Sequence, residues 1–175
     1  MENDKPVKQC SIVMYAISAE TPVEFHDVIV NGVEYWNEIL DPQNMLVFAG
    51  PVEWSVDSPY LGGFLAIGVV PTLERTYWHR SNNKQPCGRT YMKYSKDNCI
   101  ARAKIKLNLE CAEDMDEFET IVRHEIGHIL GLSDNVDFTS LMSHNIERTM
   151  QHPVDANDEE IKAVRALYGV SDDVQ

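Results

Sequence analysis

The stretch from Asp114 to Gly131 constrains the fold of this chain more than any other part of the sequence. Its apolar residues recur at three- and four-residue intervals, which is typical of one face of a helix. Asp114 and Glu117 have the spacing of a capping box, and Gly131 stands where such a helix would end. His124 and His128 lie four residues apart, so both side chains project from one face about a turn apart. The fold must therefore place this helix beside a space into which both imidazoles project.

Two imidazoles in this arrangement can bind one zinc ion, which takes nitrogen ligands at about 2.0 Å. A catalytic zinc needs a third protein ligand and keeps one position open for water. Beyond the helix, Asp134 supplies a carboxylate, and we predict a metal site of His124, His128 and Asp134. Asp137 and His144 are alternative third ligands. If no metal binds, the two histidines are simply polar residues on the exposed face of the helix.

Glu125 follows the first of these histidines and is expected to project beside the metal. A carboxylate in that place can accept a proton from a metal-bound water and later deliver it to a leaving amine. Peptide bonds are hydrolysed by this chemistry. The sequence therefore predicts one catalytic zinc ion, with Glu125 as the general base of a peptidase.

The rest of the chain predicts a single α/β domain, of the α+β kind, that spans residues 1–175. The length of 175 residues and the hydrophobic content of 43% suit one core. Apolar runs predict strands at 10–18, 45–49, 62–71 and 101–109, with a weaker edge strand at 52–56. Helical periodicity predicts two further helices, at 21–40 and 157–168. Residues 72–98 are expected to form a long polar loop with a short hairpin at 90–94.

Charge and hydropathy exclude several classes of partner. The formal net charge is -13, which repels nucleic-acid phosphates and anionic lipid surfaces. No run approaches the roughly 20 consecutive apolar residues of a membrane span. We therefore expect a monomer that acts on a peptide or protein substrate, with neither nucleic acid nor a membrane as its partner. The first nine residues are polar and show no signal peptide, which predicts an intracellular or virion-associated protein.

The four cysteines are too few for a disulfide scaffold and lack the paired spacing of a cysteine zinc site. Cys87 can pair with Cys99, because both lie in the polar loop, and Cys10 can then pair with Cys111. Sequence alone does not establish the connectivity, and four buried free thiols are the alternative.

Residues 124–134, HEIGHILGLSD, resemble the extended zinc signature of the metzincin metallopeptidases, and most closely that of the matrixins. The signature normally ends in a third histidine, and Asp134 takes its place here, as in snapalysin-like enzymes. Ser140-Leu141-Met142-Ser143 resembles the Met-containing turn of the family, which implies that Met142 forms a hydrophobic floor under the metal. The matrixin tyrosine that follows this methionine is replaced by Ser143.

The run GFLAIGVVP at residues 63–71 resembles the matrixin edge strand along which an extended peptide docks. The resemblance therefore implies substrate contacts at Gly63, Phe64, Leu65, Ala66, Ile67 and, in the pocket wall, Ser143. KIKLN before the histidine helix and EEIKAVRALYG near the end complete the likeness, which covers most of the chain from about Gly62 onward.

The resemblance implies a metzincin-like zincin fold with a mixed twisted sheet, an active-site helix and a C-terminal helix. It also implies a zinc-dependent metalloendopeptidase, and the family suggests secretion as the alternative compartment. The other possibilities are a zinc-containing peptide-binding module that does not cleave, a structural zinc protein with four ligands, and an enzyme whose 72–98 loop covers its cleft. The structural zinc and calcium sites of matrixins do not carry over, so we expect no second zinc.

Overall fold

The computed structural model describes residues 13–41, 46–55, 58–60, 64–73, 86–97, 99–143 and 153–170. Their elements, in chain order, are β1 (Val13–Ser18), η1 (Val23–Phe25), α1 (His26–Ile39), β2 (Leu46–Val52), β3 (Phe64–Val70), β4 (Gly88–Tyr94), β5 (Ile100–Asn108), α3 (Met115–Ile129) and α4 (Asp158–Tyr168). Each predicted helix is found within a few residues of its expected bounds, as are the strands expected at 45–49, 62–71 and 101–109. The strand expected at 10–18 is found from Val13 onward, and its first residues lie outside the described ranges.

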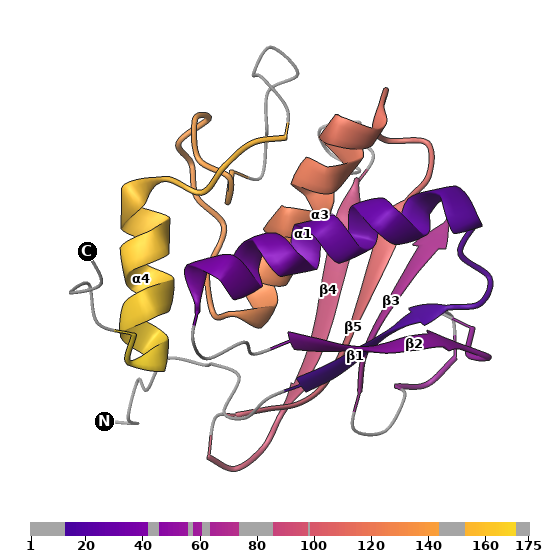
Figure 1. Cartoon of the computed structure of the whole chain (residues 1–175), viewed down its shortest axis with the longest axis horizontal. Coiled ribbons are helices and arrows are strands. Elements are labelled where there is room, and N and C mark those ends of the chain that lie inside the picture. The colour runs from indigo at the N-terminus through magenta and orange to yellow at the C-terminus, as the bar shows by residue number, and fades with distance from the viewer. Residues whose placement is uncertain are drawn as a thin grey trace.

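The described strands form one mixed sheet in the order β2-β1-β3-β5-β4. β2, β1, β3 and β5 run parallel to one another, whereas β4 runs antiparallel to β5 at one edge. Figure 1 shows the twisted sheet with α1 and α3 together on one face and α4 to one side. The predicted fold class, a mixed sheet with an active-site helix and a C-terminal helix, is thus confirmed.

The core lies between the sheet and the layer formed by α1 and α3. Trp36 of α1 is fully buried, and its indole N–H donates to the Arg123 carbonyl of α3 at 2.8 Å. The two helices approach closely because Gly32 has no side chain: a Cβ there would lie 2.6 Å from Cγ1 of Val122. This contact and the Trp36 hydrogen bond fix α3, which carries the two histidines, against α1.

The edge of the sheet is formed by a different segment from the one expected. β3 contains the residues expected at the edge, but it is hydrogen-bonded to β1 on one side and to β5 on the other. A peptide therefore cannot add to it as a further strand, and that prediction is wrong. The edge beside α3 is β4, which lies inside the stretch expected to be a long loop. The weak strand at 52–56 is also wrong, because Val52 is the last residue of β2.

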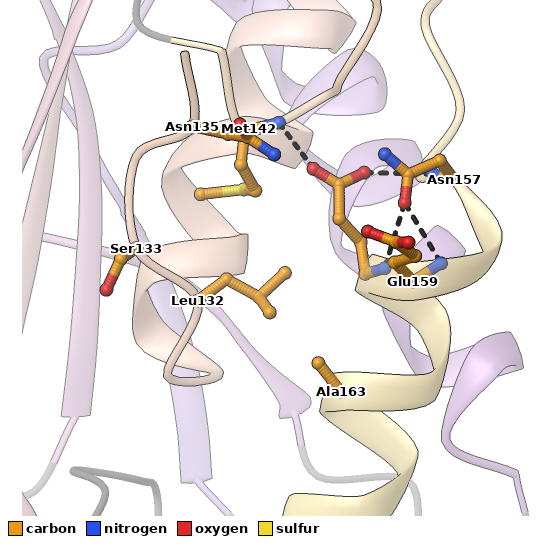
Figure 2. Close-up of a pocket in the computed structure, with 8 residues that line it drawn as sticks. Leu132, Ser133, Asn135, Met142, Asn157, Glu159 and Ala163 are labelled. Atoms are coloured by element: carbon orange, nitrogen blue, oxygen red, sulfur yellow. Dashed lines mark hydrogen bonds between the residues drawn. The ribbon is translucent and has the colours of Figure 1, made fainter. Parts of the chain in front are cut away.

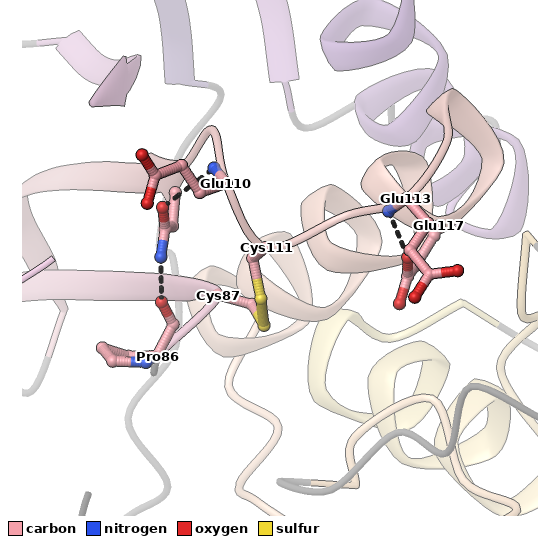
Figure 3. The surroundings of a disulfide bond; sticks show 7 residues. Pro86, Cys87, Glu110, Cys111, Glu113 and Glu117 are labelled. Carbon is pink, nitrogen blue, oxygen red and sulfur yellow. Dashed lines mark hydrogen bonds between the residues drawn. A yellow bond between two sulfur atoms is a disulfide. The ribbon is translucent and has the colours of Figure 1, made fainter. Parts of the chain in front are cut away.

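A disulfide joins Cys87 to Cys111, whose Cα atoms lie 5.2 Å apart (Figure 3). It fastens the start of β4 to the segment between β5 and α3. Asn108 strengthens the same junction: its backbone N–H donates to the Cys87 carbonyl at 2.7 Å, and its side-chain amide donates to the Pro86 carbonyl at 2.9 Å. The edge strand is therefore anchored at the end nearest the beginning of α3.

Both predicted cysteine pairings are wrong. Cys87 and Cys99 lie at opposite ends of the β4–β5 hairpin, because β4 begins at Gly88 and Ser95 bonds to Cys99 in the connecting turn. Cys111 cannot pair with Cys10 because it is already bonded to Cys87. The alternative of free thiols is also excluded for Cys87, Cys99 and Cys111, all of which are disulfide-bonded. Cys10 lies outside the described residues.

None of the helices in the described ranges has both the length and the apolar character that crossing a bilayer requires.

Candidate metal centre

α3 begins and ends at residues that the sequence marks for those roles. Asp114 accepts a hydrogen bond from the Glu117 N–H at 2.8 Å, and the Glu117 carboxylate returns a bond to the N–H of Glu113. The returning bond of the expected capping box is thus made one residue earlier. At the other end Gly131 has φ +99°, and the N–H of Leu132 bonds to the Gly127 carbonyl at 3.0 Å. These bonds turn the chain back toward the helix face that carries the histidines.

The turn brings three potential ligands together. Nε2 of His124 and Nε2 of His128 each lie 3.5 Å from Oδ1 of Asp134. One ligand atom from each of the three residues lies within 4.8 Å of the other two. Asp137, the alternative third ligand, is outside this group, and its carboxylate accepts bonds from the backbone and hydroxyl of Thr139. His144 lies outside the described residues.

Backbone carbonyls fix the orientation of both imidazoles. Nδ1 of His124 lies 2.9 Å from the Leu141 carbonyl, and Nδ1 of His128 lies 3.0 Å from the Leu132 carbonyl. A carbonyl can only accept, so each Nδ1 must carry the proton and donate it. In the neutral ring this leaves the lone pair on Nε2, which is the atom that faces Asp134.

The charges of the cluster favour an ion pair when no cation is bound. Hydrogen bonds from His124 and His128 hold the pKa of the Asp134 carboxyl far below its usual value. Burial opposes the protonation of His128, but the neighbouring carboxylates of Asp134 and Glu125 outweigh it and raise the pKa of His128. A divalent cation with the same partners would replace the proton on Nε2.

The donor set fits zinc. Two ligands bound tetrahedrally at about 2.0 to 2.1 Å lie about 3.3 Å apart, and the observed separations of nitrogen from oxygen are 3.5 Å. Two neutral imidazoles and one carboxylate are also a ligand set found in catalytic zinc sites, which leave one position open. Asp134 is on the solvent side, with 58% of its side chain exposed, whereas only 11% of the His124 side chain is exposed. The arrangement thus suits a cation that is reached from one side.

Glu125 is held away from solvent beside the edge strand. It is 5% exposed, and its Oε2 accepts a hydrogen bond from the Thr90 hydroxyl of β4 at 2.6 Å. Nothing in the sequence pointed to Thr90, because it lies 35 positions before Glu125, at the start of the short hairpin expected within the polar loop. Only knowledge that residues 88–94 form the edge strand above α3 would have indicated it.

Met142 lies beneath the histidine helix. It is 1% exposed, and a Cβ on Gly127 would come within 2.5 Å of its sulfur. Its backbone N–H donates to a carboxylate oxygen of Glu160 on α4 at 2.9 Å. Figure 2 shows Met142 and Asn157 on opposite sides of this contact, above an open hollow of about 300 Å³ between the methionine segment and α4. Glu160 lies in the helix predicted at 157–168, and no sequence signal links it to Met142.

The predicted substrate-binding residues are not gathered at this centre. Leu65, Ala66 and Ile67 are buried in the middle of the sheet, and Phe64 begins the same internal strand. Ser143 is 2% exposed and forms a bridge with Asn135. Gly63 lies outside the described residues. The contacts expected along β3 therefore have no basis in the geometry.

Comparison with protein families gives a match to the Matrixin model of peptidase family M10 over residues 46–169. No curated protein sequence matches the chain. The matched range contains the edge strand, the whole of α3, the three clustered side chains and α4.

Proposed function

The chain belongs to the matrixin family, and on that premise we propose that it is a zinc-dependent metalloendopeptidase. The observation that carries the proposal is the convergence of two imidazole Nε2 atoms on one Asp134 oxygen, with both Nδ1 atoms committed to backbone carbonyls. A pair of surface histidines would have no reason to be oriented in this way. Protein substrates follow from the family, and the finer assignments below are our own.

His124, His128 and Asp134 would hold one zinc ion, with the carboxylate in the place of the histidine that ends the matrixin signature. When bound, zinc supplies a Lewis acid that polarises a carbonyl and lowers the pKa of water. The aspartate adds a negative charge to the ligand set, as in the snapalysin-like enzymes that the sequence resembles.

Glu125 is proposed as the general base and acid. Its carboxylate accepts the proton of the attacking water and delivers that proton to the amine that leaves. Its low exposure of 5% keeps bulk water from competing for that proton. Glu125 reaches the reaction from α3, the element that also carries both histidines, so the base and two ligands keep a fixed relation.

The substrate is proposed to bind as an extended peptide along β4. Within the described residues, β4 pairs with β5 on one side only, so its other side offers backbone donors and acceptors. Strand addition is a common mode of peptide recognition at such an edge. β4 also contacts α3, which places the peptide backbone beside Glu125.

The deciding experiment measures metal content and cleavage together. The protein is purified without added metal, its zinc is measured by mass spectrometry, and unstructured casein is digested with and without a chelator. We expect one zinc per chain and cleavage that the chelator abolishes. Glu125→Gln should keep the zinc and lose at least about 100-fold in kcat.

A Glu125→Gln variant that cleaves at the wild-type rate would refute the mechanism. One zinc per chain without cleavage in the wild-type protein would instead favour a peptide-binding module of the same fold. Glu119→Gln is unsuitable as the matched control because Glu119 pairs with Arg123. Glu159→Gln changes the same chemical group at an exposed position of α4 and should leave zinc and cleavage unchanged.

A further inference from the structure

The inner face of β4 contacts the carboxylate of Glu125 at two alternate positions. Side chains of a strand alternate between its faces, so Gly88 and Thr90 point to the same side. A Cβ on Gly88 would lie 2.6 Å from Cγ and 2.7 Å from Cδ of Glu125, which is closer than real contacts allow. The carboxylate thus occupies the space that the missing side chain leaves.

Thr90 supplies the directed contact. Its hydroxyl lies 2.6 Å from Oε2 of Glu125 and 3.1 Å from the Glu125 backbone oxygen. The shorter distance falls in the range of a charge-assisted O–H···O⁻ bond. Both acceptors belong to the same residue, so the hydroxyl is directed at Glu125 whichever oxygen takes its proton.

Thr90 is itself held rigidly. It is β-branched and stands in a strand, where few χ1 rotamers are available, and it pairs with Ile105 of the neighbouring strand. A glutamate on a helix, by contrast, has several freely rotating bonds, and fixing it has an entropic cost. Because the donor on β4 is rigid, the entropic cost of fixing the Glu125 side chain is incurred during folding and not at the moment of reaction.

We propose that Thr90 is a positioning residue for the general base: its hydroxyl holds Oε2 of Glu125 and so fixes the direction of the carboxylate that exchanges the proton of water. This inference rests on the proposed peptidase function. Because β4 is also the strand along which the peptide is proposed to bind, the substrate backbone and the base are set by one element. The hydroxyl of Thr90 bonds to Glu125, so the side chain acts on the reaction through that carboxylate.

The test compares Thr90→Val with Thr90→Ser. Valine keeps the shape and the β-branch but has no hydroxyl, whereas serine keeps the hydroxyl. We expect Thr90→Val to bind one zinc, to keep KM within about threefold, and to lose about 10- to 100-fold in kcat. Thr90→Ser should keep kcat within about threefold of the wild type. Thr139→Val removes a hydroxyl of the same kind at an exposed turn and should change neither parameter.

A second measurement does not depend on turnover. The melting temperature of the zinc-free protein is compared in a double-mutant cycle of Thr90→Val and Glu125→Ala. We expect Thr90→Val to lower the Tm of the wild type and to have no such effect once Glu125 is alanine. Equal effects in both backgrounds would show that the hydroxyl and the carboxylate do not interact, and would overturn the inference.

The outcomes separate this inference from the proposed function. A wild-type kcat in Thr90→Val, a serine variant as slow as the valine variant, or a rise in KM alone would each overturn the role of Thr90 while the peptidase stands. If the wild-type protein carries zinc and cleaves nothing, the proposed function fails. A coupled cycle would then leave only a structural hydrogen bond, and the catalytic role of Thr90 would fail with the function.

Discussion

Removing the carboxylate of Glu160 should damage the metal centre from a distance. Glu160 is 7% exposed and accepts three hydrogen bonds. Its Oε1 accepts from the Ser140 hydroxyl and from the Met142 N–H at 2.9 Å, and its Oε2 accepts from the Asn157 N–H at 2.9 Å. The first two donors flank Leu141, whose carbonyl orients His124. Glu160→Ala therefore removes the hydrogen bonds between α4 and the segment that orients His124, a proposed metal ligand.

The size of the effect follows from the donors that lose their partner. The Met142 N–H keeps the Ser140 hydroxyl oxygen as an acceptor at 3.1 Å, so two donors lose their partner, the Ser140 hydroxyl and the Asn157 N–H. At roughly 1 to 2 kcal/mol for each unsatisfied donor, the change costs about 2 to 4 kcal/mol. For a chain of this size, 1 kcal/mol corresponds to about 2 to 4 °C, so the Tm should fall by about 4 to 16 °C. Loss of the support for His124 should weaken zinc binding by about 10- to 100-fold.

Glu160→Gln gives an intermediate test. The remaining carbonyl oxygen can still accept from Ser140 and Met142, but the new amide nitrogen would face the N–H of Asn157, and two donors repel. The variant should therefore lose about 1 to 3 kcal/mol and keep most of its zinc affinity.

The measurements are thermal unfolding by circular dichroism and zinc affinity by competition with a coloured chelator. Glu159→Ala is the matched control, because it removes the same charge from the same helical turn at an exposed position. It should change stability by no more than about 0.5 kcal/mol. If Glu160→Ala melts within about 2 °C of Glu159→Ala and binds zinc equally well, the link between α4 and the metal centre is refuted.

Three further perturbations test separate parts of the structure. The Tyr15 hydroxyl is buried and has no hydrogen-bond partner among the described residues, so Tyr15→Phe should not destabilise, and should gain up to about 1 to 3 kcal/mol in urea unfolding. Burial raises the pKa of this hydroxyl, so the unfolded chain ionises first and the wild type loses stability as pH rises above about 10. The phenylalanine variant should lack that loss between pH 8 and pH 11. A phenylalanine variant that is less stable than the wild type at pH 8 contradicts this. Replacing Cys87 and Cys111 by serine opens a 24-residue separation and should cost about 3 kcal/mol, measured by the same unfolding; no loss means that the bond does not restrict the unfolded chain. Asp134→Ala should weaken zinc binding by more than about 100-fold and Asp137→Ala should not, and the reverse result identifies Asp137 as the third ligand.

The local parts of the structure could be predicted because their information is local. The periodicity of α3, the glycine at its end and the aspartate after it lie within one short stretch, and the bonds that shape them span only a few residues. Three of the residues predicted for the site, His124, His128 and Asp134, are therefore found together. The helix predicted at 157–168 is found for the same reason, and the structure adds a local capping box of Asn157 and Glu160 at its start.

The edge strand could not be predicted in this way, because strand order depends on pairings between distant segments. Residues 64–70 are apolar on both faces, which is typical of a central parallel strand, and this sign was available in the sequence. GRTYMKY at 88–94 is largely polar, so the sequence predicts only a long polar loop with a short hairpin at 90–94. Polar and charged residues are nevertheless common on edge strands, where they discourage pairing with other chains.

The contacts of Thr90 and Glu160 were missed for a related reason. They reach Glu125 and Met142 across 35 and 18 positions of the chain, and no spacing rule links residues so far apart. The disulfide was predicted wrongly for the same reason. Cys87 and Cys99 are closer in sequence than Cys87 and Cys111, but the β4–β5 hairpin places Cys87 and Cys99 at opposite ends.

The close fit of Gly127 against Met142 has a consequence for how this sequence can change over evolutionary time. Gly127 occupies one of the two unspecified places in the His-Glu-x-x-His pattern, and any side chain there would enter the volume of the methionine sulfur. Positions 127 and 142 therefore share a single space, and an enlargement at one has to be preceded or matched by a reduction at the other. Gly127→Ala should be tolerated far better together with Met142→Ala than alone. The motif allows any residue at position 127, but in this chain Met142, fifteen positions away, restricts it to glycine.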